Sequence, residues 1–133
     1  MKKQIIPGYA VFALALVISV GSVSFLGPCV HEDGTFGPCH WAGRTLLGLG
    51  CVLGALAALA LCVRDARFGV FLGAVPVSVL GILTPGTLIS LCKMSSMHCR
   101  AVMQPAMTIL FAAAGLAALC GAVICFREKK ERA

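Results

Sequence analysis

The stretch PAMTILFAAAGLAALCGAVICF, residues 105–126, contains no charged side chain, and the charged tail REKKER, residues 127–132, follows it directly. A helix that crosses a hydrocarbon core of about 30 Å needs roughly 20 mostly apolar residues. This stretch is therefore long enough to cross a membrane, and the tail marks the point at which the helix leaves the lipid.

Three earlier apolar stretches have similar lengths. The chain of 133 residues is 59% hydrophobic and only 12% charged, which leaves no separate soluble domain. The third stretch contains Pro76 and the sequence Thr84-Pro85-Gly86-Thr87, so we expect its outer third to be kinked or unwound. The sequence predicts one all-α domain over residues 1–133, an integral membrane four-helix bundle with spans at about 5–26, 41–63, 68–91 and 105–126.

The basic residues are divided unevenly between the two sides of the membrane that these spans define. Three lie on one side, Arg44, Lys93 and Arg100, and eight on the other: Lys2, Lys3, Arg64, Arg67, Arg127, Lys129, Lys130 and Arg132. Basic residues accumulate in cytoplasmic segments. Both termini are therefore predicted to be cytoplasmic and the two short loops, at about 27–40 and 92–104, extracytoplasmic. The net charge of +6 comes from basic residues at the span ends, as membrane topology requires, and not from a nucleic-acid-binding surface. The expected partner is therefore the lipid bilayer and not nucleic acid.

Small residues recur within the spans. The pairs Gly50-x-x-x-Gly54 and Gly69-x-x-x-Gly73, together with the Ala/Gly-rich stretch 112–122, provide faces on which helix backbones can approach closely. We expect these faces to pack within this one chain.

Reactive side chains are concentrated in the two predicted outer loops. Four cysteines lie in or beside these loops, and all three histidines and several methionines lie with them: Cys29, Cys39, Cys92, Cys99, His31, His40, His98, Met94, Met97 and Met103. The other four cysteines lie within spans two and four, where a thiol packs as a small hydrophobic group: Cys51, Cys62, Cys120 and Cys125. The outer group is therefore the candidate site.

The first interpretation of the two cysteine pairs outside the cytoplasm is that they form structural disulfides. Thiols in that compartment are usually oxidised, so we expect disulfides. Four cysteines allow three pairings, and Cys29 with Cys39 and Cys92 with Cys99 is one of them. In this interpretation the protein is a structural membrane subunit with two inert disulfides.

A metal site is the second interpretation. The segment from Cys92 to Cys99 contains thiol, thioether and imidazole donors in eight residues. Thiolates and thioethers favour Cu(I), and imidazole also suits zinc, copper or iron, so Met94, Met97 and the three histidines are candidate ligands. The spacing matches no closed zinc motif.

A quinone-linked thiol oxidase is the third interpretation. Four spans with a cysteine pair in each outer loop are similar in layout to membrane oxidases that pass electrons from periplasmic dithiols to quinone. Those enzymes carry Cys-x-x-Cys in the first loop, whereas nine residues separate Cys29 and Cys39 here. Arg44 could lower a thiol pKa or contact the quinone, although an interfacial arginine is the commoner role, and Trp41 is expected to anchor the span at the interface.

The motifs CHWAGR at 39–44 and MHC at 97–99, with Pro105 before the last span, resemble a family of small bacterial four-helix membrane proteins known only as a domain of unknown function. The resemblance implies the same fold over nearly the whole chain and a location in the bacterial inner membrane. It also suggests a neighbouring ABC-type permease. It implies no catalytic residue.

Together these patterns predict a non-catalytic accessory protein that presents an extracytoplasmic Cys/His/Met cluster for metal or redox handling. An ABC-type permease or an extracytoplasmic thiol or metal protein is the expected partner. The chain contains no Gly-rich phosphate loop and no acidic network within its spans, so we do not expect it to drive transport by itself.

Overall fold

The computed structural model describes residues 2–24, 38–85, 87–88 and 99–133. In chain order these residues form α1 (Lys2–Val23), α2 (Pro38–Cys62), α3 (Arg67–Leu83), a π-helical turn η1 (Cys99–Met103) and α4 (Gln104–Arg132). The predicted all-α four-helix bundle is confirmed.

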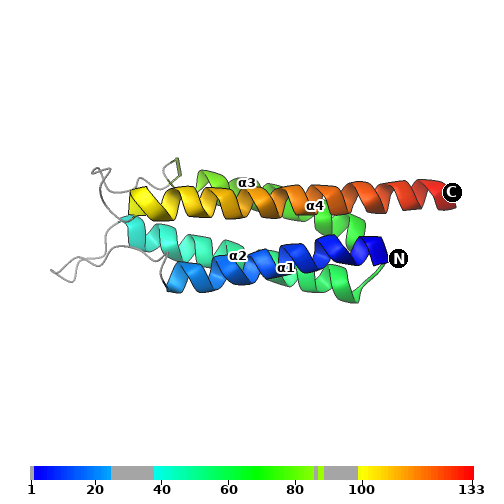
Figure 1. Cartoon of the computed structure of the whole chain (residues 1–133), viewed down its shortest axis with the longest axis horizontal. Helices are drawn as coiled ribbons and strands as arrows, with labels where there is room; N and C mark the ends of the chain where they lie inside the picture. The colour runs from blue at the N-terminus through cyan, green and yellow to red at the C-terminus, as the bar shows by residue number, and fades with distance from the viewer. Residues whose placement is uncertain (1, 25–37, 86, 89–98) are drawn as a thin grey trace.

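Consecutive helices are antiparallel, so both chain termini lie at one end of the bundle (Figure 1). We call this the terminal end, and we call the opposite end, where α1 ends and α2 begins, the loop end. Helix α1 packs against α2 and α4, and helix α3 packs against α4 and α2. Helices α1 and α3 therefore lie on one diagonal of the bundle.

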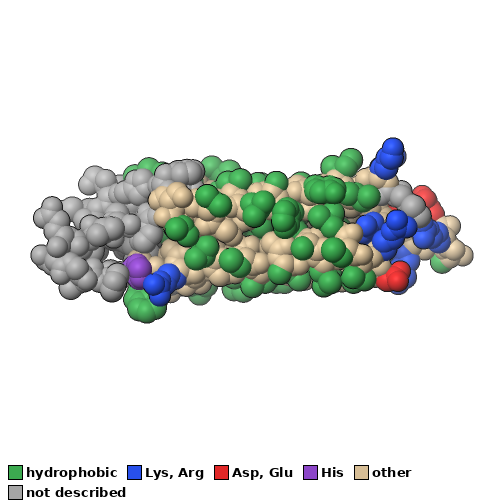
Figure 2. All heavy atoms as spheres, turned by 90° about the horizontal axis from the view of Figure 1, so that it is seen from below, with side chains coloured by type: hydrophobic (Ala, Val, Ile, Leu, Met, Phe, Trp, Pro, Cys, Tyr) green, Lys and Arg blue, Asp and Glu red, His purple; other side chains and the backbone are tan. Residues whose placement is uncertain are grey.

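The outer surface of the bundle is apolar. Helices α1, α2 and α4 each contain a stretch long and apolar enough to cross a membrane. Large hydrophobic side chains on the outside are exposed, among them Leu16, Leu59, Ile109 and Leu116. Figure 2 shows such side chains over the middle of the bundle and charged side chains gathered at the terminal end. A surface of this kind is suited to lipid and unsuited to water, so the chain is a membrane protein.

The core follows one face of each helix. In α4 the buried positions recur at intervals of three and four residues, a spacing typical of closely packed helices: Met107, Phe111, Ala114, Ala118 and Ala122. The buried hydroxyl groups bond within their own helices: Ser22 donates to the Ile18 carbonyl at 2.7 Å and Ser78 to that of Ala74 at 2.9 Å. These polar groups are thus satisfied without water.

Helices α3 and α4 are joined by two phenylalanine rings that pack on glycines of the facing helix. A Cβ atom added at Gly81 of α3 would come within 2.2 Å of Cδ1 of Phe111 on α4. One added at Gly121 of α4 would come within 3.0 Å of ring carbons of Phe71 on α3. Each helix therefore supplies one ring and one glycine to the contact.

Helices α1 and α2 are joined by aliphatic and small side chains instead of rings, with Leu61 on Gly8 and Ile18 and Ser19 on Gly50. A Cβ atom added at Gly50 would lie 2.7 Å from Oγ of Ser19, and one added at Gly54 would lie 3.7 Å from Cβ of Ala15. The prediction that the Gly50 and Gly54 pair packs within the bundle is therefore confirmed.

The equivalent prediction for Gly69 and Gly73 is wrong, because a Cβ atom added at either would meet nothing within 4 Å. The buried face of α3 contains Val70, Ala74 and Ser78, so the two glycines lie to one side of it.

Helix α3 is the shortest of the four, with 17 residues. It ends at Leu83, whereas the third span was expected to continue to Leu91. Pro85 has no N–H group to donate to the preceding turn, so the helix cannot continue regularly through it. Thr84 is buried and its hydroxyl donates to the Leu80 carbonyl at 2.6 Å, while the N–H of Leu88 donates to the Leu83 carbonyl at 3.0 Å. The end of α3 is thus covered by protein and hydrogen-bonded.

Candidate functional site

Most of the predicted outer cluster lies outside the described residues: Cys29, His31, Cys92, Met94, Met97 and His98. Of Cys39 and Cys99 the structure describes the backbone alone, in the first turn of α2 and of η1. Both turns lie at the loop end (Figure 1). Whether the four sulfur atoms pair or share a ligand therefore stays a prediction.

Three predicted site residues of α2 are described. His40 is half-buried and its ring meets that of Trp41 edge to face, with ring centroids 5.9 Å apart and planes at 81°. Trp41 and Arg44 are exposed. Because residues four apart share a helix face, His40 and Arg44 are neighbours on α2. An exposed indole beside the loop end fits the expected interfacial anchor.

The remaining thiols lie within the helices. Cys51, Cys62, Cys120 and Cys125 are free, and only Cys125 among them is buried. Within the part of the chain that the structure describes, no group of three His, Cys, Asp or Glu side chains is placed to hold a metal ion.

The terminal end contains a partly buried polar network that the sequence analysis did not predict. Arg67, the first residue of α3, is only 6% exposed. Its Nε donates a hydrogen bond of 2.7 Å to the carbonyl oxygen of Ala60, in the last turn of α2. That carbonyl is among those a helix leaves without partners at its C-terminus, so the arginine completes the end of α2.

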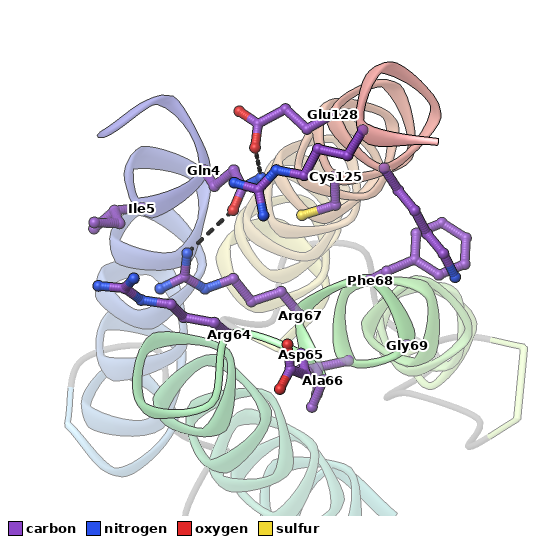
Figure 3. A pocket seen from close by; sticks show the side chains of 13 residues that line it. Gln4, Ile5, Arg64, Asp65, Ala66, Arg67, Phe68, Gly69, Cys125 and Glu128 are labelled. Carbon is purple, nitrogen blue, oxygen red and sulfur yellow. Dashed lines mark hydrogen bonds between the residues drawn. The ribbon is translucent and has the colours of Figure 1, made fainter. Parts of the chain in front are cut away.

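The same guanidinium reaches across the diagonal of the bundle to α1. Its Nη1 donates to Oε1 of Gln4 at 3.2 Å, and Nε2 of Gln4 in turn donates to the carboxylate of Glu128 on α4 (Figure 3). One residue from each helix therefore takes part: Gln4, Ala60, Arg67 and Glu128. We call the three side chains the Arg67–Gln4–Glu128 network.

A cleft of about 810 Å³ opens beside this network. It is lined by residues of α1, the α2–α3 turn, α3 and α4, with the Cys125 thiol and the Glu128 carboxylate on one wall and Ile5 on another (Figure 3). Four of its side chains are basic: Arg64, Arg67, Lys129 and Arg132. Two are acidic, Asp65 and Glu128. Such a cleft favours an anion.

Arg67 was interpreted from the sequence only as a topology signal. The burial of Arg67 depends on how α3 is oriented after the α2–α3 turn. That orientation is set by tertiary packing and cannot be read from the local sequence. A partial signal existed, because Gln4 directly precedes the first predicted span, Arg67 directly precedes the third, and Glu128 follows the last. In a bundle with both termini at one end, these three polar residues are brought to the same level.

Comparisons with known proteins identify the family of the chain. The curated proteins and the solved structures contain no match to it. A family model described as "Domain of unknown function (DUF4418)" matches residues 11–127, which include most of all four helices. This agrees with the resemblance proposed from the sequence, and the chain belongs to the DUF4418 family.

Proposed function

We propose that this protein is an accessory subunit of the bacterial cytoplasmic membrane that presents a Cys/His/Met cluster to the outside for metal or redox handling. Both termini are then cytoplasmic and the loop end faces outward. The basic residues support this orientation, because eight of the eleven belong to the terminal end, where Figure 2 shows most of the charged side chains.

The observation that carries the proposal is the placement of donor residues along the chain. All three histidines and four of the eight cysteines belong to the two connections at the loop end or to the first turns of the helices that follow them. Two disulfides require four cysteines but no histidine and no methionine. The excess of imidazole and thioether donors therefore favours a role beyond cross-linking, with copper, zinc or iron as the candidate ions.

The metal content of protein purified under reducing conditions tests the proposal. We expect the wild-type chain to retain a soft or borderline ion, and we expect His40→Ala and His98→Ala to lose it. Cys51→Ala and Cys120→Ala are the matched controls, because both thiols lie in the apolar middle of a helix and should leave the metal content unchanged. If no variant differs from the wild type and reduction lowers only stability, the structural interpretation with two inert disulfides is correct.

A thiol oxidase is distinguished by a second measurement on the same protein. An oxidase would reduce an added quinone when supplied with a protein dithiol, and its activity would depend on the cysteines and on Arg44. We expect no such turnover from an accessory subunit. We further propose an ABC-type permease as its neighbour, which rests on the family resemblance and would be tested by cross-linking from the loop end.

A further inference from the structure

The cleft at the terminal end has an excess of positive charge that the proposed function does not use. Four basic side chains face two acidic ones along its lining. One of the acidic groups, Glu128, already accepts a hydrogen bond from Gln4. The electrostatic field in the cleft therefore favours an anionic group.

Burial makes the positive charge of Arg67 costly, because this side chain is 6% exposed and the two hydrogen-bond acceptors that the described residues offer it are neutral. They are the carbonyl oxygen of Ala60 and the side-chain oxygen of Gln4. A buried charge is stabilised most by a charged partner that also accepts hydrogen bonds. An anion in the cleft beside Arg67 would provide one.

The position of the cleft narrows the choice of anion. It lies at the end of an apolar bundle where charged side chains begin, and its lining also includes the apolar residues Ile5, Phe68 and Val70. Phe68 is exposed and its ring packs near that of Phe126, with centroids 6.1 Å apart. The site therefore combines basic groups with lipid-facing apolar groups, as headgroup sites between transmembrane helices do.

From this geometry we infer that the cleft binds the phosphate group of an anionic phospholipid. The basic side chains contact the phosphate, and the acyl chains leave past the exposed Phe68 ring, along the apolar outer surface of α3 and α4 where this ring lies near that of Phe126. The inference is independent of the metal or redox role at the loop end, since it involves the opposite end of the bundle.

Two triple variants test the inference, and each removes three positive charges from the terminal end. The cleft variant is Arg64→Gln/Lys129→Gln/Arg132→Gln, and the control variant is Lys2→Gln/Arg127→Gln/Lys130→Gln. All six side chains are exposed and lie near the terminal end, but only the first three line the cleft. Neither variant replaces a residue of the Arg67–Gln4–Glu128 network, and far-UV circular dichroism in detergent verifies that both variants fold. The single variants Lys129→Gln and Lys130→Gln repeat the comparison with less change.

The measurement is native mass spectrometry of the purified chain with equal amounts of phosphatidylglycerol and phosphatidylcholine. We expect the wild type and the control variant to prefer phosphatidylglycerol, and the cleft variant to lose about tenfold or more of that preference. Equal losses in both triple variants would mean a general surface attraction and would overturn the inference, as would a wild type without preference. A competition with glycerol phosphate and inorganic phosphate separates the sources. If either displaces the lipid at equal concentration, the site binds a soluble phosphate and the lipid assignment is wrong.

Discussion

The two helix pairs of the bundle achieve close contact in different ways. Helices α3 and α4 meet through the rings of Phe71 and Phe111, each packed on a glycine of the facing helix. Helices α1 and α2 also pack side chains on glycines, but these side chains are aliphatic or small: Leu61 on Gly8, and Ile18 and Ser19 on Gly50. Because lipid is as apolar as the helix surfaces, association within a membrane depends on packing rather than on removal of apolar surface from water. A ring on a glycine leaves no space for even one methyl group. The α3–α4 pair should therefore be the less tolerant of change.

The substitution Gly81→Ala should have the largest effect on this comparison. Its new methyl group would overlap the Phe111 ring, because an ideal Cβ atom lies only 2.2 Å from Cδ1. We expect a loss of about 3 kcal/mol in the free energy of unfolding, the upper range for overpacked cores. Titration with sodium dodecyl sulfate in mixed micelles, followed by circular dichroism, measures it. The double variant Gly81→Ala/Phe111→Leu should recover part of the loss, and no recovery would show that the ring is not the obstacle.

The substitution Gln4→Leu tests the contact between the α1–α2 pair and the α3–α4 pair, not the packing within either pair. It removes an acceptor from Arg67 and a donor to Glu128, both partly or fully buried. We expect a loss of about 1–3 kcal/mol in the free energy of unfolding, the cost of leaving buried polar groups without partners. The matched control is Gln104→Leu, which makes the same chemical change in the first residue of α4 at the loop end. Equal losses in the two variants would contradict a special role for the network.

The substitution Gly50→Ala makes the same change as Gly81→Ala in the other pair. The nearest atom to the new methyl group is Oγ of Ser19, at 2.7 Å, which belongs to a short side chain that can rotate. We expect a loss of about 1 kcal/mol, near the lower limit for overpacking. If the double variant Gly50→Ala/Ser19→Ala does not show this loss of stability, the Ser19 hydroxyl is its cause. A loss as large as that of Gly81→Ala would contradict the difference between the two helix pairs.

The substitutions Gly69→Ala and Gly73→Ala should have the smallest effects. Neither new methyl group meets an atom within 4 Å, and alanine favours a helix over glycine by about 1 kcal/mol. We expect unchanged or slightly raised stability in the same titration. A clear loss, or a change in the oligomeric state by analytical ultracentrifugation, would mean that a second molecule covers this face of α3.

The fold was predictable because its determinant is repeated four times. Three of the four apolar stretches form helices long enough to cross the lipid, the fourth forms a shorter apolar helix, and a chain of this length has few ways to connect four such stretches. The end of α3 was less predictable. Thr84-Pro85 indicated a break, but whether the residues after it continue a helix depends on what covers them, which is a tertiary property.

The candidate site at the loop end and the network at the terminal end also differ in how well the sequence predicts them. The donor residues of the loop end can be recognised by their chemistry, since cysteine, histidine and methionine stand out in an apolar chain, yet most lie outside the described residues. The Arg67–Gln4–Glu128 network was missed for the opposite reason. Its residues are ordinary at the end of a span, and only the diagonal contact between α3 and α1 brings them together.

The shortness of α3 has a consequence for the surrounding bilayer. At 1.5 Å per residue its 17 residues extend about 25 Å, about 5 Å less than a typical hydrocarbon core. The apolar part of α4, residues 105–126, extends about 33 Å, slightly more than that thickness. The lipid next to α3 must become thinner than the lipid on the opposite side, or the whole bundle must tilt, and each Å of mismatch has a modest cost. The bilayer around the protein is therefore expected to be asymmetric, with its thinnest part beside α3.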